Sequence, residues 1–210
     1  VEDIENSFDV ELDRELYKLN YNVAPTQDLP VVTNQQNKQV SFLKWGLVPS
    51  WSKDLKFGSK MINARIETIT EKPSFKKAIQ ERRCVVIADG YYEWKKTSQG
   101  KEPYYITMEN SKLFSFGGIW EKWTSPVGET VKTFSIITQP SFKEIEHIHN
   151  RMPLQIMPEQ KDYWLSAETG EEALDFAIEH QKNKLKSYVV STQVNSVTNN
   201  FPDLLNPLSD

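Results

Sequence analysis

The chain contains two short blocks in which a titratable side chain lies among aromatic and polar residues. One is Ala88–Trp94, which contains Glu93, and the other is His149–Pro153, which begins with a histidine. Histidine and glutamate are side chains that commonly move protons in enzyme sites. Chemistry is therefore expected first at these two blocks.

Glu93 is expected on a strand in a partly apolar setting. The apolar run Cys84–Ala88 predicts a buried strand, and the Asp89-Gly90 turn after it leads into a second strand, Tyr91–Lys95. Aromatic side chains flank Glu93 on both sides, and desolvation there would raise its pKa and suit it to proton transfer. The alternative is a solvated glutamate between two packed aromatic residues.

His149 is expected on a connection, where its side chain can reach a cleft. Arg151 would keep the imidazole near a cation or a bound phosphate. The alternative for both is an ordinary polar loop. A metal pair of His147 and His149 lacks a third ligand cluster, and nothing in the sequence indicates a metal or organic cofactor.

Two further residues could serve such a site, whereas the single cysteine is not expected to. Asn63 supplies an amide that can donate and accept, and Arg65 would point to the same side if this piece is extended. A capping or turn asparagine is the alternative. Cys84 begins the buried apolar run, so an inert core thiol is favoured over a nucleophile paired with a histidine.

Charge is distributed unevenly, although the net charge is only −4. Residues 1–20 contain seven acids and two bases, whereas residues 38–101 contain fourteen bases and six acids. The second segment predicts a basic face that could follow a phosphate backbone, with ordinary solvated charge as the alternative. Trp51 lies among these lysines in a loop, so it could be exposed and stack on an unpaired base, or fold onto the core.

Composition predicts one domain in a reducing compartment. The 210 residues are 38% hydrophobic, which supports one sizeable core, and no low-complexity linker divides them. No apolar stretch reaches membrane-spanning length, and the acidic N-terminus lacks the basic and apolar regions of a signal peptide. One cysteine excludes an internal disulfide. These features predict a cytoplasmic protein with no membrane partner.

The pattern of apolar runs and turns predicts an α+β fold, with a mostly antiparallel, curled or barrel-like sheet and flanking helices. Helices are expected at Val1–Phe8, Lys72–Arg82, Ser141–His147, Pro158–Leu165 and Gly170–Gln181. Strands are expected at Asp28–Thr33, Val40–Trp45, Cys84–Ala88, Tyr91–Lys95, Tyr104–Met108, Phe114–Trp120, Val131–Thr138 and Tyr188–Ser191.

Five blocks in order carry a resemblance to a known family. They are Tyr21–Thr26, Trp45–Trp51, Ile62–Thr68, Arg83–Trp94 and His149–Pro153. Together they resemble the SOS-response-associated peptidase (SRAP) family, from about Tyr21 to the end of the chain. Each block alone is weak, but five in family order are specific.

The resemblance implies a protein that binds single-stranded DNA and traps an abasic site through an N-terminal cysteine, whose amine and thiol close a thiazolidine on the lesion aldehyde. It implies that Asn63 positions the open sugar, that Glu93 moves protons, and that His149 assists ring opening and imine chemistry. Arg65 and Arg151 would hold phosphates and Trp51 would wedge against the bases. Asn22 and Pro25 would line the pocket floor.

The chain begins Val1-Glu2-Asp3 and has no N-terminal cysteine, so we expect one SRAP-like domain over residues 1–210 whose cysteine-bearing segment is missing from this sequence. The resemblance also implies DNA cross-linking with autoproteolytic peptidase activity, possible partners at replication forks, and a bacterial protein associated with the nucleoid. Two alternatives stay open. One is a non-covalent module for single-stranded DNA, and the other is a peptidase or hydrolase that uses Glu93 and His149.

Overall fold

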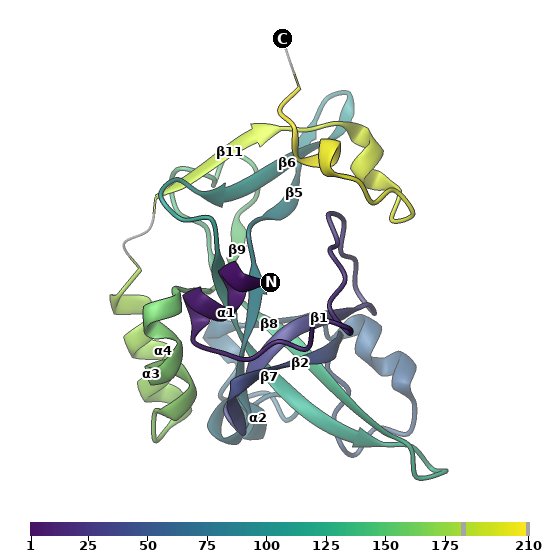
Figure 1. Ribbon diagram of the computed structural model, residues 1–210, viewed down its shortest axis with the longest axis vertical. Helices are drawn as coiled ribbons and strands as arrows, with labels where there is room; N and C mark the ends of the chain where they lie inside the picture. The colour runs from purple at the N-terminus through teal and green to yellow at the C-terminus, as the bar shows by residue number, and fades with distance from the viewer. Residues whose placement is uncertain (182–183, 209–210) are drawn as a thin grey trace.

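The computed structural model describes residues 1–181 and 184–208 (Figure 1). Its strands are β1 Asp28–Thr33, β2 Gln36–Trp45, β3 Asn63–Arg65, β4 Arg83–Ala88, β5 Tyr91–Thr97, β6 Gly100–Met108, β7 Phe114–Thr124, β8 Thr130–Pro140, β9 Arg151–Pro153, β10 Gln155–Ile156 and β11 Leu185–Val189. The α-helices are α1 Glu2–Phe8, α2 Lys76–Glu81, α3 Lys161–Ser166 and α4 Gly170–Glu179. Short 3-10 helices are η1 Leu55–Lys60, η2 Ile66–Thr68, η3 Pro158–Gln160, η4 Thr192–Asn195 and η5 Pro202–Leu205.

Five strands close into a barrel. β1 pairs with β2 and β4, β4 pairs with β7, β7 pairs with β8, and β8 returns to β2. The β2–β8 pair is parallel, and so is β3 along β8, whereas the other pairs in the barrel are antiparallel. Closure leaves few exposed strand edges and encloses an apolar interior. The predicted α+β class with a mostly antiparallel, barrel-like sheet is confirmed.

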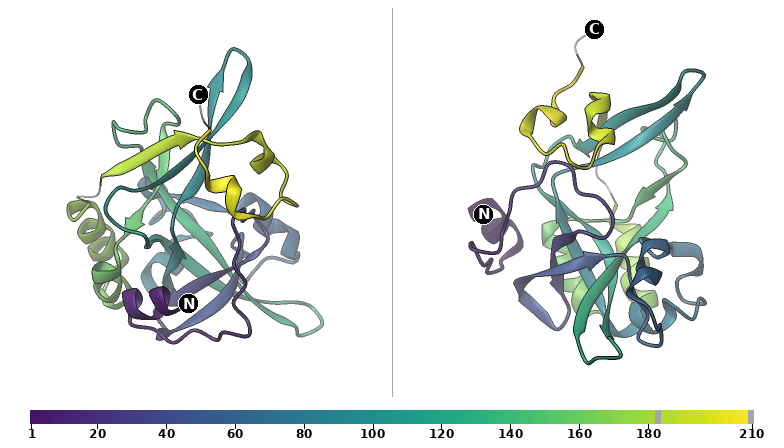
Figure 2. Two further views of the ribbon diagram at one scale, coloured as in Figure 1. Left: turned by 45° about the horizontal axis from the view of Figure 1, so that its top comes forward. Right: turned by 90° about the vertical axis from the view of Figure 1, so that its right-hand side faces the viewer.

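A second sheet, β5-β6-β11, carries Glu93 away from the barrel. The chain passes from β4 into β5 through Asp89-Gly90, and the β5–β6 hairpin projects beyond the barrel (Figures 1 and 2). A Cβ on Gly90 would lie 2.3 Å from the Tyr105 hydroxyl, so only glycine fits this turn. The turn therefore fixes how the hairpin leaves β4 and where Glu93 is held.

Helices α2, α3 and α4 pack on one side of the barrel and are joined to it by Arg83, the first residue of β4. The Arg83 side chain is buried, and its guanidinium donates to the carbonyls of Ile79 and Gln80 in α2 and of Trp164 in α3, each at 2.9 Å. It also donates to the Ala167 carbonyl. One side chain thus satisfies carbonyl groups at the C-terminal ends of two helices.

The loop that precedes β3 is pressed against the end of β2. Gly46 has φ +128°, and a Cβ there would lie 2.6 Å from the carbonyl oxygen of Gly58 in η1. A Cβ on Gly58 would in turn lie 2.4 Å from the Gly46 oxygen. This backbone contact needs glycine on both sides, and it fixes η1, with the exposed residues of its loop, beside the barrel.

The predicted helix Ser141–His147 is wrong. Residues 143–148 form successive turns, in which the Ile145 and Ile148 amides bond to carbonyls three residues back and the Glu146 and His149 amides to carbonyls four residues back. Ile145 and Ile148 are buried, and an apolar spacing of three is shared by helices and by tight turns. The predicted helix Lys72–Arg82 begins only at Lys76, because residues 72–75 around Pro73 form turns.

The other predicted elements are present with shifted ends. α1, α4, β1 and β4–β8 match their predicted runs, although β6, β7 and β8 extend farther than the apolar runs did. Pro158–Leu165 divides into η3 and α3, and β11 starts three residues and ends two residues before the predicted Tyr188–Ser191. β3 is not among the predicted strands, and its parallel pairing with β8 holds it in place.

Candidate nucleic-acid interface and active site

The two sequence blocks that contain Glu93 and His149 meet in space. The Oε2 atom of Glu93 on β5 lies 3.9 Å from Nδ1 of His149, which precedes β9. The Glu93 side chain is 26% exposed and that of His149 is 43% exposed. Burial raises the pKa of Glu93, and the neighbouring His149 partly offsets that rise. A carboxyl group with a raised pKa beside an accessible imidazole is suited to passing protons near neutral pH.

The backbone of Arg151 sets the orientation of the His149 ring. The Arg151 amide donates to Nδ1 of His149 at 3.2 Å, and the Arg151 carbonyl lies 3.1 Å from the same atom. Nδ1 has a backbone partner in either tautomer, because it accepts from the Arg151 amide when unprotonated and donates to the Arg151 carbonyl when protonated. The predicted connection is confirmed, because His149 is exposed between the turns and β9.

Strand β3 presents Asn63 and Arg65 on the same exposed face. Both side chains are exposed, and Ala64 between them is fully buried. The piece is extended, which is the condition under which Arg65 was expected on the same side as Asn63. Across β8, Thr138 pairs with Arg65 on one side and with Pro153 of β9 on the other. β8 therefore places Asn63 and Arg65 on one flank and the His149 segment on the other.

The Arg151 guanidinium is engaged within the protein. It donates to both carboxylate oxygens of Glu67 and to the carbonyl and hydroxyl oxygens of Thr138, and its side chain is 20% exposed. This hydrogen-bonded partner lowers the pKa of Glu67. Arg151 thus ties η2 to β8 and β9, and its predicted contact with phosphate would have to share the guanidinium with Glu67.

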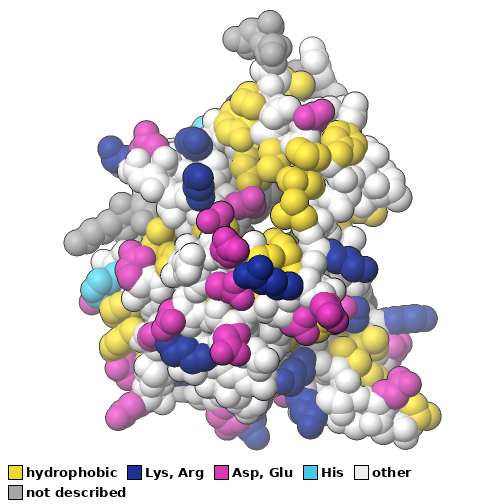
Figure 3. Space-filling view, in the orientation of Figure 1, with side chains coloured by type: hydrophobic (Ala, Val, Ile, Leu, Met, Phe, Trp, Pro, Cys, Tyr) yellow, Lys and Arg dark blue, Asp and Glu magenta, His cyan; other side chains and the backbone are white. Residues whose placement is uncertain are grey.

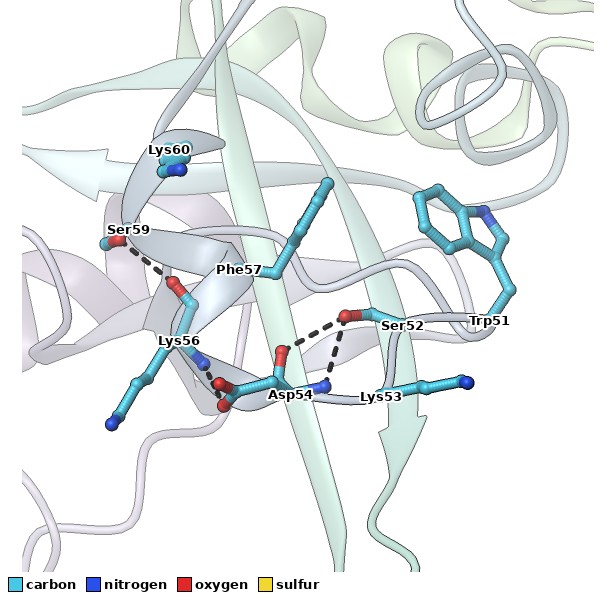
Figure 4. Close-up of a pocket in the computed structure, with 8 residues that line it drawn as sticks. All are labelled: Trp51, Ser52, Lys53, Asp54, Lys56, Phe57, Ser59 and Lys60. Atoms are coloured by element: carbon cyan, nitrogen blue, oxygen red, sulfur yellow. Dashed lines mark hydrogen bonds between the residues drawn. The ribbon is translucent and has the colours of Figure 1, made fainter.

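Trp51 is exposed, and the alternative in which it folds onto the core is wrong. Its side chain is 61% exposed and meets Phe57 edge-on, with ring centroids 5.5 Å apart. The pair lines an open hollow of about 620 Å³ (Figure 4). Lysines surround the two rings at positions 53, 56 and 60. Exposed aromatic rings among lysines match the needs of an unpaired nucleic-acid strand.

Asn22 and Pro25 lie on the loop before β1 and differ in exposure. The Asn22 side chain is buried, and its amide nitrogen donates to the carbonyls of Val194, Ser196 and Asn199 at 3.0–3.1 Å. Pro25 is exposed. Asn22 therefore holds the C-terminal segment against this loop, and its predicted place on a pocket floor stays a prediction, as does that of Pro25.

Cys84 is fully buried in β4, and burial raises the pKa of its thiol. A thiol in this state forms little thiolate at neutral pH. The inert core thiol predicted from the sequence is confirmed, and Cys84 does not take part in the site.

Acidic side chains gather near α1. The face over α1 shows Asp and Glu side chains across its centre, with Lys and Arg side chains among them (Figure 3), in agreement with the acids Glu2, Asp3 and Glu5 of α1. η1, β9 and the β5–β6 hairpin lie along another side (Figure 2, right). The segments that contain the lysines, η1 and the hairpin, thus lie on the same side of the molecule as β9, which His149 precedes.

Two negative findings apply to residues 1–181 and 184–208. No helix there is long and apolar enough to cross a bilayer. No group of three or more His, Cys, Asp or Glu side chains in these ranges is arranged to hold a metal ion.

Comparison with known proteins assigns this arrangement to a family. The model of the SOS response associated peptidase (SRAP) family matches residues 1–197. The chain belongs to the SRAP family. It is 41% identical over 193 residues to the Bacillus subtilis protein named abasic site processing protein YoqW, covering 90% of this chain and 86% of that protein.

Two more distant matches are consistent with this family assignment. The chicken protein named abasic site processing protein HMCES is 32% identical over 226 residues, covering 91% of this chain and 67% of that protein. A crystal structure of a protein from Bacteroides thetaiotaomicron superposes with a TM-score of 0.84 at 27% identity, covering 98% of this chain and 96% of that one. The predicted family is confirmed.

The structure adds residues that the sequence did not single out. Glu67 and Thr138 bind Arg151, and Tyr104 lies opposite Glu93 on β6. Glu67 and Arg151 are 84 residues apart, so no local pattern links them. Tyr104 could have been found by pairing the two strands of the predicted hairpin residue by residue.

Proposed function

We propose that this protein binds single-stranded DNA, holds an abasic site between Asn63, Glu93 and His149, and processes it. The observation that carries the proposal is the largely buried Glu93 carboxyl 3.9 Å from the exposed His149 ring. The relatives YoqW and HMCES, both named abasic site processing proteins, support it. The lysines and the exposed Trp51 supply the contacts that an unpaired strand needs.

The chemistry of an abasic sugar assigns a task to each residue. In the closed sugar, the C1′ hydroxyl passes its proton to the Glu93 carboxylate as the C1′–O4′ bond breaks, and His149 gives a proton, regained from solvent, to the ring oxygen O4′, which leaves an aldehyde and a free hydroxyl. Asn63 would hydrogen-bond the open sugar through its amide. An amine then adds to the aldehyde carbon, and protonated Glu93 gives its proton to the resulting hydroxyl, which leaves as water, while solvent takes the remaining proton from nitrogen to give an imine.

We propose, from the family resemblance, that the covalent step uses an N-terminal cysteine of the gene product; the buried thiol of Cys84 does not supply it. The thiol adds across the imine, so that a carbon–sulfur bond forms and the thiol proton passes to nitrogen. The net reaction joins aldehyde and cysteine into a thiazolidine and releases one water. Glu93, left as carboxylate by the preceding step, can accept and return the proton.

The test is the mass of the full-length gene product after incubation with single-stranded DNA that carries one abasic site. We expect an adduct that survives a denaturing gel and maps by mass spectrometry to an N-terminal cysteine. Salt-sensitive binding without an adduct would instead support the non-covalent module. Cleavage of a peptide substrate with no affinity for DNA would support the hydrolase. Autoproteolysis, association with the nucleoid and partners at replication forks remain predictions.

Replacing Arg65 by Ala should weaken binding to every single-stranded sequence by roughly tenfold. In the described part of the chain no hydrogen bond or ion pair engages its exposed guanidinium, so it is free to neutralise a phosphate. The slope of log affinity against log salt should fall by about 0.7 to 1, the value of one phosphate contact. Fluorescence anisotropy titrations over a series of salt concentrations measure both.

Arg14 provides the matched control for Arg65. Its side chain is 62% exposed and lies against Glu5, in the acidic N-terminal segment. Arg14→Ala should leave affinity and salt slope unchanged. Equal losses for the two variants would show that net charge, rather than contact at β3, controls binding.

A further inference from the structure

A second pair of aromatic rings lies beside Glu93, on elements other than the η1 loop that carries Trp51 and Phe57. Tyr104 of β6 is directly opposite Glu93 of β5 in the antiparallel register, so the two side chains emerge on the same face of the hairpin. The Tyr104 ring meets the His147 ring edge-on, with centroids 6.3 Å apart and planes at 88°. Glu93 therefore has His149 on one side and the Tyr104–His147 pair next to it.

Both rings of this pair are open to solvent. His147 is exposed on the turns that lead to His149, and Tyr104 is partly exposed, unlike the buried Tyr105 beside it. Positive charge accompanies them, because Lys95 follows Glu93 by two residues on the same face of β5, and the charge of Lys101 at the start of β6 acts on Glu93. The arrangement repeats what surrounds Trp51 and Phe57: two rings edge-on, partly open, with lysines beside them.

The two aromatic pairs reach the site from different segments. η1 carries Phe57 and ends three residues before Asn63, whereas Tyr104 lies across the hairpin from Glu93. An abasic nucleotide has no base, so the bases on both of its sides lose a stacking partner. Aromatic rings stabilise such bases whatever their sequence. A single platform at Trp51 would support only one of these two bases.

We propose that Tyr104 and His147 form a second stacking platform, which supports the nucleobase on the opposite side of the abasic sugar from the base held at Trp51. This rests on the proposed function and extends it, because it gives the site a defined partner on each side of the lesion. The His147 ring moves no proton in the proposed mechanism. It packs edge-on against the Tyr104 ring and holds that ring in place.

Half-site oligonucleotides test this directly. Each carries tetrahydrofuran, a stable analogue of the abasic sugar that cannot open to an aldehyde, with five nucleotides on its 5′ side only or on its 3′ side only. Tyr104→Ala should weaken binding of one half-site roughly 5- to 100-fold and leave the other within about twofold. Trp51→Ala should show the reverse pattern. Fluorescence anisotropy at one fixed salt concentration measures all four affinities.

Three further variants distinguish a loss of stacking from a loss of folding. Tyr104→Phe keeps the ring and should bind both half-sites like the unchanged protein. His147→Ala removes the exposed ring that packs on Tyr104 but leaves every residue of the hairpin unchanged, and should weaken the same half-site as Tyr104→Ala by a few-fold. Tyr163→Ala, on α3 with a 40% exposed ring stacked on Phe176, is the matched tyrosine control and should change neither affinity.

The proposal is overturned if Tyr104→Ala weakens neither half-site, weakens both equally, or weakens the same one as Trp51→Ala. It is also overturned if His147→Ala leaves both affinities unchanged while Tyr104→Ala lowers the thermal unfolding temperature. A protein that binds no tetrahydrofuran oligonucleotide, even with nucleotides on both sides, would show instead that the proposed function fails and the platform with it.

Discussion

Replacing Glu93 by Gln should lower the rate of adduct formation on abasic single-stranded DNA by about 10²- to 10³-fold, the usual contribution of a positioned acid–base group. Affinity for a tetrahydrofuran oligonucleotide should stay within about twofold, because Gln keeps the shape of Glu and binding depends on phosphate and base contacts. Single-turnover gel assays give the rate, and anisotropy gives the affinity. Equal losses in rate and affinity would show that Glu93 holds the strand rather than moving protons.

The pH dependence of the rate gives a second readout. Burial raises the pKa of Glu93, so the protonated form needed to release water persists to higher pH than for an exposed glutamate. The rate should fall on the alkaline side as this proton is lost, and the Gln variant should lack that limb. Glu109→Gln, an exposed carboxylate just after β6, is the matched control and should retain the full profile.

Glu93→Gln should keep or raise the unfolding temperature near pH 7, although it lowers the rate of adduct formation. Since the folded-state pKa of Glu93 is raised above its unfolded value, its contribution to stability is full below the unfolded pKa and is lost as pH rises through the folded pKa. Near pH 7, Glu93→Gln should therefore unfold at the same or a higher temperature than the unchanged protein. The difference should vanish near pH 4, and thermal melts at the two pH values measure it.

Local sequence patterns were enough to predict the setting of several candidate site residues. The apolar run before Asp89-Gly90 placed Glu93 on a strand, and Asn63 and Arg65 were expected on the same side if their segment is extended. The loop signals around Trp51 left exposure and packing onto the core as alternatives, and the structure shows the ring exposed. These predictions succeeded because the periodicity and turn chemistry of a few neighbouring residues determine burial there.

What the sequence could not predict are contacts between segments far apart in the chain. Arg151 pairs with Glu67 from 84 residues away, and Asn22 donates to carbonyls 172 to 177 residues away. Neither partner leaves a local signal, so Asn22 was assigned to the pocket from the family resemblance alone, and Arg151 was assigned to phosphate from the resemblance and from its position two residues after His149. The turns before His149 were predicted as a helix because their apolar residues have a spacing that helices share.

Arg83→Met should reduce the free energy of unfolding by about 3–5 kcal/mol, a large share of the roughly 5–15 kcal/mol typical of a folded domain. Methionine fills much of the space but cannot donate to the carbonyls of Ile79, Gln80, Trp164 and Ala167, which would stay buried without partners. The positive charge at the C-terminal ends of α2 and α3 would also be lost. Urea unfolding followed by tryptophan fluorescence measures the change.

Two companion variants separate the hydrogen bonds of Arg83 from its charge. Arg83→Lys keeps the charge but has a single donor group, which cannot reach all four carbonyls, so we expect most of the loss to persist. Arg14→Met removes an exposed guanidinium whose ion pair with Glu5 is worth about 0–1 kcal/mol and should change stability little. Since Arg83 begins the strand that leads to Glu93, the Arg83 variants should lose adduct formation on warming but regain it on cooling. A stability within about 1 kcal/mol of the unchanged protein for Arg83→Met would mean that apolar packing, not this guanidinium, joins the helices to the barrel.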